Sequence, residues 1–524
     1  MLVKKEDLYL FGLALMAIGL PVSEFLMSLS IMFLAIAWLV NGVKKVHWQA
    51  IKQNKLFWAS SLLFLIPLIS LIWTDDFDYA LNDLRIKLPL LLVPFFVASY
   101  SLSERNFFIL LALLIGSSFV GSIILFVNYH LNLAGQHVNL REISIFISHI
   151  RFSLIIDINI YILIYAAIKW RNRYSVIAIA IALWFIYFIF FLGSGNGFIG
   201  LLIIFLFGIF LLLFKSSYKK LAYSILLVFL AFCIYILYLS HLSYKSHFVA
   251  KNEPYNEMKE IVKKGADYFS LKNDYQLENG YYIWRNISNP ELRREWEERC
   301  DPEYIEFDAQ GQDVYGTLIR YLTSKALTKD SLGIHQLSEQ DIENIQNGDI
   351  SVNQHRWNNL QLRIDQLFYQ MMAHYYQNDP GNKPFLQRIY YWFGAIEIIK
   401  ANPILGVGVG DIQMEFDKYF KSELKALGNQ YWHHTHNQYL TYFVISGVIG
   451  FLLFIWAVFY PLTIYIRRNS ILALAQIILL ISFLSEDTLE TQPGVTLYVL
   501  FAALAISLFS YKDKEFISTE DPLP

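Results

Sequence analysis

The sequence has few charged residues for its length. Asp, Glu, Lys and Arg make up 16% of its 524 residues, whereas about a quarter is usual in soluble domains. Hydrophobic residues make up 56% and aromatic residues 17%, and the net charge is only −2. No overall electrostatic field therefore points to nucleic acid as a partner. This composition excludes an ordinary soluble protein and predicts a polytopic membrane protein.

Cysteine is also scarce. Cys233 lies in an apolar run and Cys300 in a polar segment, so we do not expect them to pair. They indicate neither an oxidising nor a reducing compartment. Lys4 and Lys5 precede an apolar run that resembles a signal peptide, but no small-residue cleavage site follows it. We expect this run to be the first retained span.

Apolar runs dominate the rest of the chain. A helix needs about 20 apolar residues to cross the hydrocarbon core, and by this measure we predict about twelve spans. They fall near 8–23, 25–41, 57–73, 88–103, 107–128, 152–168, 175–193, 198–214, 221–240, 438–460, 471–486 and 495–510. Basic residues gather in alternate connections, at Lys44, Lys45, Lys52, Lys55, Lys169, Arg171, Arg173, Lys215, Lys219, Lys220, Arg467 and Arg468. The positive-inside rule places these and both termini in the cytoplasm.

One long polar segment separates spans nine and ten. We expect it to divide the chain into a membrane domain at 1–240, a domain on the outer face at 241–437, and a second membrane part with a cytoplasmic tail at 438–524. Apolar residues at helical spacing predict an amphipathic helix at 355–377 and another helix at 385–401, with an irregular part around 250–315. No strand-like alternation or internal repeat is evident. The predicted fold class is all-α.

A histidine-rich stretch, His433-His434-Thr435-His436, lies where this segment returns to an apolar run. At neutral pH an imidazole could take a proton from an attacking hydroxyl, because its ordinary pKa is about 6.5. Position alone also fits an interfacial histidine that hydrogen-bonds its own loop. Zinc sites draw three or more well-spaced ligands, and no such spacing completes one here, so we expect no metal.

Three patterns in the last third of the chain occur in a fixed order. Arg388-x-x-x-Trp392 is followed by Asn402-Pro403-x-x-Gly406-x-Gly408, and then by His436-Asn437, nine residues, Gly447, two residues and Gly450. In order and spacing these patterns resemble the O-antigen ligase and O-antigen polymerase superfamily. Further stretches resemble a Bacteroidetes-type branch of it, at 291–294, 317–325 and 486–494. One departure is Asn196, where many members carry an arginine.

The resemblance implies a GT-C-like membrane bundle in the bacterial inner membrane that moves a glycan from undecaprenyl pyrophosphate at the periplasmic face. It makes His436 the base or the residue that orients the acceptor, and it implies no cofactor or metal. The implied substrate-binding residues are Arg388, Arg151, Arg320, His434, Asn437, Gln438, Trp392 and Asn196. An arginine fork suits pyrophosphate oxygens. From the residues alone, Arg388 would by default be a solvated or ion-paired helix residue. Arg151 could equally snorkel to lipid headgroups.

Several functions remain open. A ligase would transfer the glycan, with inversion, to the lipid A-core during lipopolysaccharide biosynthesis, and this is the predicted activity. A polymerase would join lipid-linked repeat units instead, and such enzymes more often divide their outer residues over two large loops. A flippase of the same glycans would need ionisable groups near the bilayer midplane, whereas the predicted spans are nearly free of them. A scaffold for envelope enzymes is the fourth alternative.

Overall fold

The computed structural model describes residues 5–42, 45–133, 145–213, 219–251, 268–270, 275–354, 358–377, 384–423 and 428–519. The chain divides into two compact units. The first comprises Met1–Ala134, Asn139–Leu211 and Gln387–Pro524, and the second comprises Gly135–Val138 and Leu212–Leu386. The basic residues Lys4, Lys44 and Lys215 and the predicted helical turn at 355–357 lie outside the described residues.

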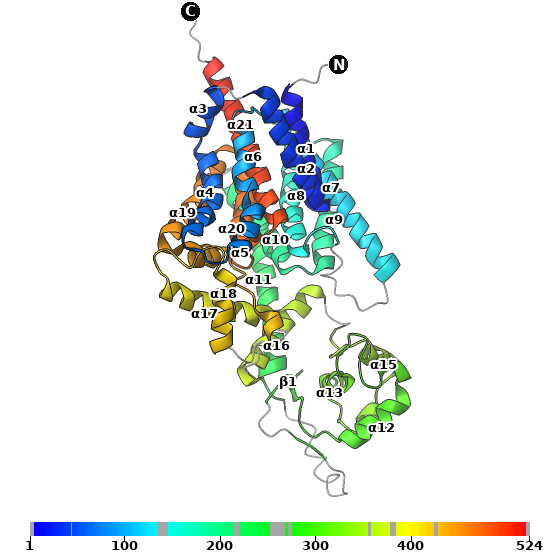
Figure 1. The fold of residues 1–524 in the computed structure, drawn as a ribbon. Coiled ribbons are helices and arrows are strands. Elements are labelled where there is room, and N and C mark those ends of the chain that lie inside the picture. Colours follow the sequence, from blue (N-terminus) through cyan, green and yellow to red (C-terminus); the bar gives the residue numbers. More distant parts are fainter. Residues whose placement is uncertain are drawn as a thin grey trace, which may run out of the picture. The chain divides into compact units, whose positions relative to one another are not determined.

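The first unit is a helical bundle (Figure 1). Its helices are α1 (Lys5–Val22), α2 (Glu24–Asn41), α3 (Lys45–Gln53), α4 (Lys55–Ser70), α5 (Phe77–Lys87), α6 (Pro89–Val97), α7 (Glu104–Asn128), α8 (His149–Trp170), α9 (Arg173–Leu192), α10 (Gly195–Leu213), α17 (Pro384–Ala401), α18 (Ile412–Glu423), α19 (Gln438–Arg468), α20 (Ser470–Ser482) and α21 (Gln492–Thr519). Short helical turns occur at η1 (Leu71–Trp73), η2 (Tyr129–Leu133), η7 (Asn429–Tyr431) and η8 (Thr488–Glu490). Helices α17 and α18 lie at one end of this bundle, and the first turn of α1 and the last turns of α21 lie at the other (Figure 1).

Within the described ranges, 9 helices are long and apolar enough to cross a membrane. They are α2, α4 with η1, α7, α8, α9, α10, α11, α19 and α21, and two shorter apolar helices cover Asp7–Val22 and Ser470–Ser482. The expected all-helical, multi-pass class is confirmed, but this criterion gives fewer spans than the predicted twelve. The expected span at 88–103 contains α6, which has only 9 residues. Pro89 separates α6 from α5, because proline has no N–H to continue the helical ladder.

Close helix packing in the first unit depends on small residues. Helices α1 and α2 form a hairpin that turns at Ser23, whose hydroxyl accepts a hydrogen bond from the Leu26 backbone N–H and caps α2. A Cβ added to Gly19 would lie 2.6 Å from the Leu26 Cβ, so glycine lets the two helices approach. Helix α21 is central, since 94% of its apolar window is buried.

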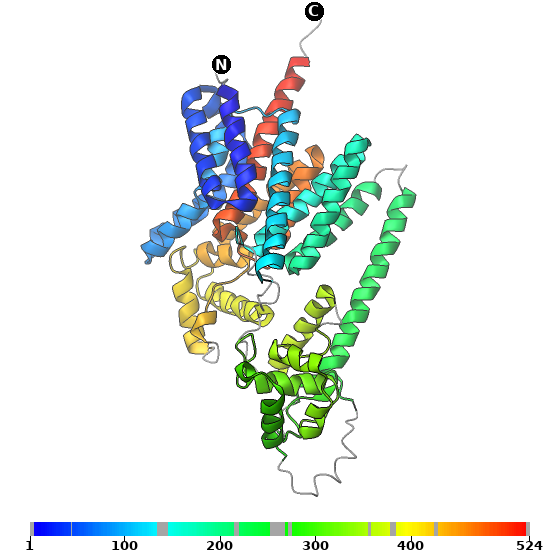
Figure 2. The same ribbon diagram turned by 90° about the vertical axis from the view of Figure 1, so that its right-hand side faces the viewer.

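The second unit has its own core. It comprises α11 (Lys219–Phe248), the strands β1 (Leu277–Glu278) and β2 (Tyr281–Tyr282), α12 (Asn289–Arg299), η6 (Pro302–Tyr304), α13 (Val314–Ser324), α14 (Ser331–His335), α15 (Glu339–Gln346) and α16 (Asn359–Gln377). The end of α11 lies beside the shorter helices of this unit (Figure 2), where His247 Nε2 lies 3.1 Å from Asp365 Oδ1 on α16. Trp296 and Tyr321 are among its fully buried core residues.

The two helices predicted within the polar segment are present. Helix α16 covers the described part of the range 355–377, and α17 covers the range 385–401. Helix α17 ends just before Asn402-Pro403, as expected. Residues from Gln387 onward cluster with the helices of the first unit.

Candidate functional site

The histidine loop ends where α19 begins. Asn437 is the N-cap of α19, and its side-chain oxygen accepts hydrogen bonds from the backbone N–H groups of Tyr439 and Leu440. Its amide also donates to the Leu484 carbonyl at 3.0 Å. His436, directly before the cap, has a φ of 45°, a conformation that non-glycine residues seldom adopt. The cap therefore fixes the backbone that carries the histidine.

A break in α19 locks this helix to the preceding glycine-rich loop. Gly447 has a φ of 59° and a ψ of −165°, which are not helical. The Val444 carbonyl is thereby free to accept a hydrogen bond of 2.9 Å from the Val407 N–H. A Cβ at Gly447 would lie 2.2 Å from the Ile404 carbonyl oxygen, and one at Gly406 would lie 2.4 Å from the Val444 oxygen. The glycines of two predicted motifs thus meet at one backbone contact.

One buried carboxylate joins the two arginines that the sequence singled out. Glu486 Oε1 lies 2.6 Å from Arg388 Nη2, and Glu486 Oε2 lies 3.5 Å from Arg151 Nη1. Arg388 also donates to the Ser485 carbonyl, and Arg151 donates to the Asp487 carbonyl. Burial raises the pKa of Glu486, although the two arginines act in the opposite direction. We call Arg388, Glu486 and Arg151 the arginine bridge, and with Glu486 ionised its net charge is +1.

A second carboxylate supports the histidine loop. Asp487 accepts hydrogen bonds from the hydroxyls of Thr441 at 2.6 Å and Thr435 at 3.2 Å. Its Oδ2 lies 3.2 Å from His434 Nδ1. Burial alone would raise the pKa of Asp487, but His434, His436 and the Thr441 hydroxyl lower it well below its ordinary value. Asp487 in turn raises the pKa of His434 against the effect of burial.

His436 has a different electrostatic environment from His434. Burial lowers the pKa of His436 to about 4, and Arg388 adds to this effect while Asp487 opposes it. The Tyr391 ring of α17 lies 5.6 Å from the His436 ring, measured between centroids. The His434 ring is stacked at 6.5 Å. His436 is consequently neutral at physiological pH, and its lowered pKa also makes it a weaker base than an ordinary histidine.

Two further residues predicted to bind substrate, Asn196 and Trp392, lie close to the arginine bridge along the chain or in space. Asn196, at the start of α10, accepts a hydrogen bond of 3.0 Å from the Ser485 hydroxyl and so reaches the segment that carries Glu486. Trp392 lies one turn after Arg388 on α17. Its indole N–H, like Arg151 Nε, is buried without a hydrogen-bond partner among the described residues. These two donors are available to an oxygen-rich ligand.

Gln438 and Arg320 make contacts of a structural kind. Gln438 is fully buried; it donates to Glu490 and accepts from the Leu489 N–H. Arg320 lies in the second unit, where it pairs with Glu278 at 2.7 Å. Its guanidinium also covers the Tyr369 ring at 4.2 Å.

Sequence reasoning missed a buried ion cluster beneath the histidine loop. Lys87 Nζ lies 2.7 Å from Asp83 Oδ1 and 2.7 Å from Glu490 Oε2, and its side chain has no exposed surface. Asp83 and Lys87 are four residues apart on α5, a spacing that allows pairing on one helix face. This four-residue spacing is the one feature of the sequence that could have predicted the Asp83–Lys87 pair. Glu490 also binds Gln438, so the cluster anchors the first turn of α19.

An apolar groove opens next to the site. Its volume is about 460 Å³, and it lies between α19 and α20. Its lining residues are Tyr439, Ile455, Phe459, Leu462, Ile477, Leu480, Ile481 and Leu484. Tyr439 follows the N-cap of α19, and Leu484 precedes Ser485 and Glu486, so one end of the groove adjoins the arginine bridge.

In the part of the chain that the structure describes, no group of three or more His, Cys, Asp or Glu could hold a metal ion.

The fold is that of a multi-pass membrane protein. The arginine bridge and the histidine loop lie at one end of its helical bundle. Residues 333–455 match the family model described as O-antigen ligase. The chain therefore carries an O-antigen ligase family domain, and proteins of this family are membrane enzymes that transfer glycans. The matched residues include Arg388, Trp392 and His436. No curated protein matches the sequence.

Proposed function

We propose that the protein transfers a glycan from undecaprenyl pyrophosphate to the lipid A-core, with inversion at the anomeric carbon. The observation that carries this proposal is the arginine bridge on the segment that supports the histidine loop, together with the neutral His436. Two fixed guanidinium groups suit a pyrophosphate, and a neutral imidazole suits a general base. Glycosyl transfer from a lipid pyrophosphate requires both of these functions.

The proposed reaction needs no cofactor or nucleotide. His436 takes the proton of an acceptor hydroxyl as its oxygen attacks the anomeric carbon, and the bond from that carbon to the pyrophosphate oxygen breaks. Arg388 and Arg151 stabilise the negative charge that develops on the leaving pyrophosphate. Trp392, Asn196 and the buried N–H of Arg151 contact the glycan or phosphate oxygens. His436 then releases its proton to water.

The groove between α19 and α20 supports a lipid-linked donor. Its apolar lining favours an isoprenoid chain, and its position would leave the pyrophosphate at the arginine bridge. The basic residues at the far end of α19 support a periplasmic site, because the positive-inside rule places Arg467 and Arg468 in the cytoplasm. In this orientation both termini are cytoplasmic.

A polymerase is the second candidate, because the family domain is common to both activities. The concentration of polar chain in one segment, 241–437, favours the ligase. Arg320 remains a candidate for contact with the glycan through the second unit.

A reconstituted assay tests the proposal. We expect the His436→Ala variant to lose transfer to the lipid A-core while its amount in the membrane is unchanged. The matched control is His335→Ala, which removes an exposed histidine of the second unit and should retain transfer. Transfer by the His436→Ala variant at the normal rate would remove this residue from the mechanism. Chain growth on the lipid carrier without core acceptor would identify a polymerase.

A further inference from the structure

Helix α17 has one buried face, which packs into the core of the first unit. Tyr391, Ala395 and Ile398 on this face belong to one hydrophobic cluster and follow each other at helical steps of four and three residues. The same spacing leads back one turn from Tyr391 to Gln387, which is only 9% exposed. An amphipathic helix ordinarily has an apolar residue at such a position. A glutamine there requires a hydrogen-bonding explanation.

The side-chain amide of Gln387 is not satisfied within the protein. Its Nε2 atom is buried without a hydrogen-bond partner among the described residues. Buried polar atoms are mostly hydrogen-bonded, because an unpaired one bears the full cost of its removal from water. Gln476 in α20 shows the usual arrangement, since it is 4% exposed and its Nε2 donates to the Val458 carbonyl at 2.7 Å. Gln387 Nε2 is therefore an atom that a ligand can satisfy.

Gln387 adjoins both parts of the proposed site. Arg388, the next residue, pairs with Glu486 in the arginine bridge. Tyr391, one turn later on the same face as Gln387, packs its ring against the His436 ring at 5.6 Å between centroids. One turn of α17 thus carries a contact to the arginine bridge, a contact to the histidine loop and a buried donor without a partner.

The sugar that reacts must lie between these two parts, because its anomeric carbon is bonded to the pyrophosphate on one side and faces the acceptor hydroxyl on the other. The substituent nearest to both is the one at C2, the ring carbon next to the anomeric carbon. We propose that Gln387 donates a hydrogen bond to the oxygen of a C2 hydroxyl or acetamido group and so selects against 2-deoxy sugars. This inference rests on the proposed function and names a feature of its donor. Either group supplies an acceptor oxygen.

The test measures binding of unreactive donor analogues to the purified full-length protein by isothermal titration calorimetry. Each analogue is an isoprenyl pyrophosphate sugar with CH₂ in place of the glycosidic oxygen, and it carries a hydroxyl, an acetamido group or hydrogen at C2. We expect the unaltered protein to bind the better of the first two about tenfold more tightly than the 2-deoxy analogue. The variant Q387L should lose this preference to within about twofold. The matched control Q476L should keep it.

Thermal unfolding of the unliganded protein provides an independent readout. Q387L removes no hydrogen bond made to Nε2 by the described residues, so its Tm should equal or exceed that of the unaltered protein. Q476L breaks the bond to Val458 and should have a lower Tm. A Tm of Q387L as low as that of Q476L would show a structural amide and overturn the proposal.

The binding results separate this inference from the proposed function. Binding of all three analogues with equal affinity by the unaltered protein, or an unchanged preference in Q387L, would overturn this inference alone. Failure of every analogue to bind the unaltered protein would overturn it together with the proposed function, because no lipid-linked sugar would then occupy the site.

Discussion

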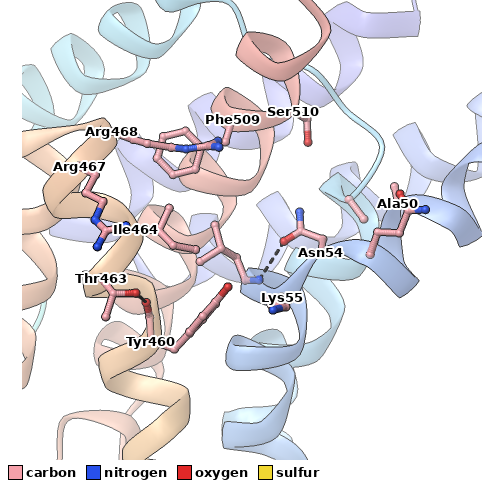
Figure 3. Close-up of a pocket in the computed structure, with 13 residues that line it drawn as sticks. Ala50, Asn54, Lys55, Tyr460, Thr463, Ile464, Arg467, Arg468, Phe509 and Ser510 are labelled. Atoms are coloured by element: carbon pink, nitrogen blue, oxygen red, sulfur yellow. Dashed lines mark hydrogen bonds between the residues drawn. The ribbon is translucent and has the colours of Figure 1, made fainter. Parts of the chain in front are cut away.

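The two ends of α19 carry arginine-rich clusters that are built differently. At its start, Arg388 and Arg151 share Glu486, whose side chain is only 4% exposed. At its end, Arg467 and Arg468 are exposed, and both line a polar cavity of about 660 Å³ (Figure 3) and a neighbouring cavity of about 220 Å³ whose lining includes Glu104. In the first cluster, both arginines donate to backbone carbonyls and pair with Glu486. In the second, the Arg468 guanidinium covers the Phe509 ring at 5.2 Å.

This difference separates a preorganised site from an open one. Partly buried arginines with fixed partners cost little reorganisation when charge develops on a ligand, which is the requirement of a transferase site. Exposed arginines attract an anion without fixing its geometry, and salt weakens their effect. The first cluster should therefore be sensitive to a change of one atom, whereas the second should respond to the number of charges.

The largest effect should follow from the removal of the negative charge of the arginine bridge. Glu486→Gln keeps the shape of the side chain but leaves Arg388 and Arg151 facing one another without a counter-charge. We expect glycan transfer to fall about a hundredfold, because a displacement of about 1 Å in a positioning group can cost that much. The measurement is the initial rate of transfer in the reconstituted assay.

The control for this change is Glu397→Gln, which breaks an exposed pair with Lys400 on α17. Exposed pairs contribute at most about 1 kcal/mol, so the control should transfer glycan normally. A Glu486→Gln variant that matches the control would show that the arginines hold their positions without the carboxylate, and the contrast between the ends of α19 would fail.

A smaller effect, on stability, should follow from a change at the break in α19. Gly447→Ala places a Cβ 2.2 Å from the Ile404 oxygen, at a φ of 59°. We expect a loss of about 3 kcal/mol in the free energy of unfolding, measured by denaturation in detergent. Gly208→Ala in α10 is the control, because nothing lies within 4 Å of its added Cβ. Equal stabilities of the two variants would mean that the break in α19 does not depend on glycine.

The sequence predicted the elements of the site better than their connections. Periodicity predicted α16 and α17, and the motif spacing singled out Arg388 and His436. Asn437 proved to be a helix cap, a role that follows from its position before an apolar run. Glu486 and Glu490 lie in the stretch 486–494 that the sequence singled out, but their partners, Arg388 and Lys87, could not be predicted from it.

The reason is that these pairs join residues far apart in the chain. Lys87 and Glu490 are separated by 403 positions, and a single sequence contains no signal for such a contact. The predicted count of twelve spans is not confirmed, and one local reason is that hydropathy does not register the interruption at Pro89. Hydropathy also predicted an apolar span at 152–168 without indicating that Asp157, within α8, is fully buried.

The smallest expected effect is on the pH dependence of transfer. An ordinary histidine loses its capacity as a base below about pH 6.5, but burial and Arg388 lower the pKa of His436 to about 4. Transfer should therefore change less than about twofold between pH 8 and pH 6, and should fall only as the pH approaches 4. Initial rates across this range, with donor stability checked in the same buffers, provide the measurement. A fall in rate centred near pH 6.5 would mean that the base is a histidine in a more solvated or more negative environment. A fall centred above pH 6.5 would instead favour His434, whose pKa Asp487 raises.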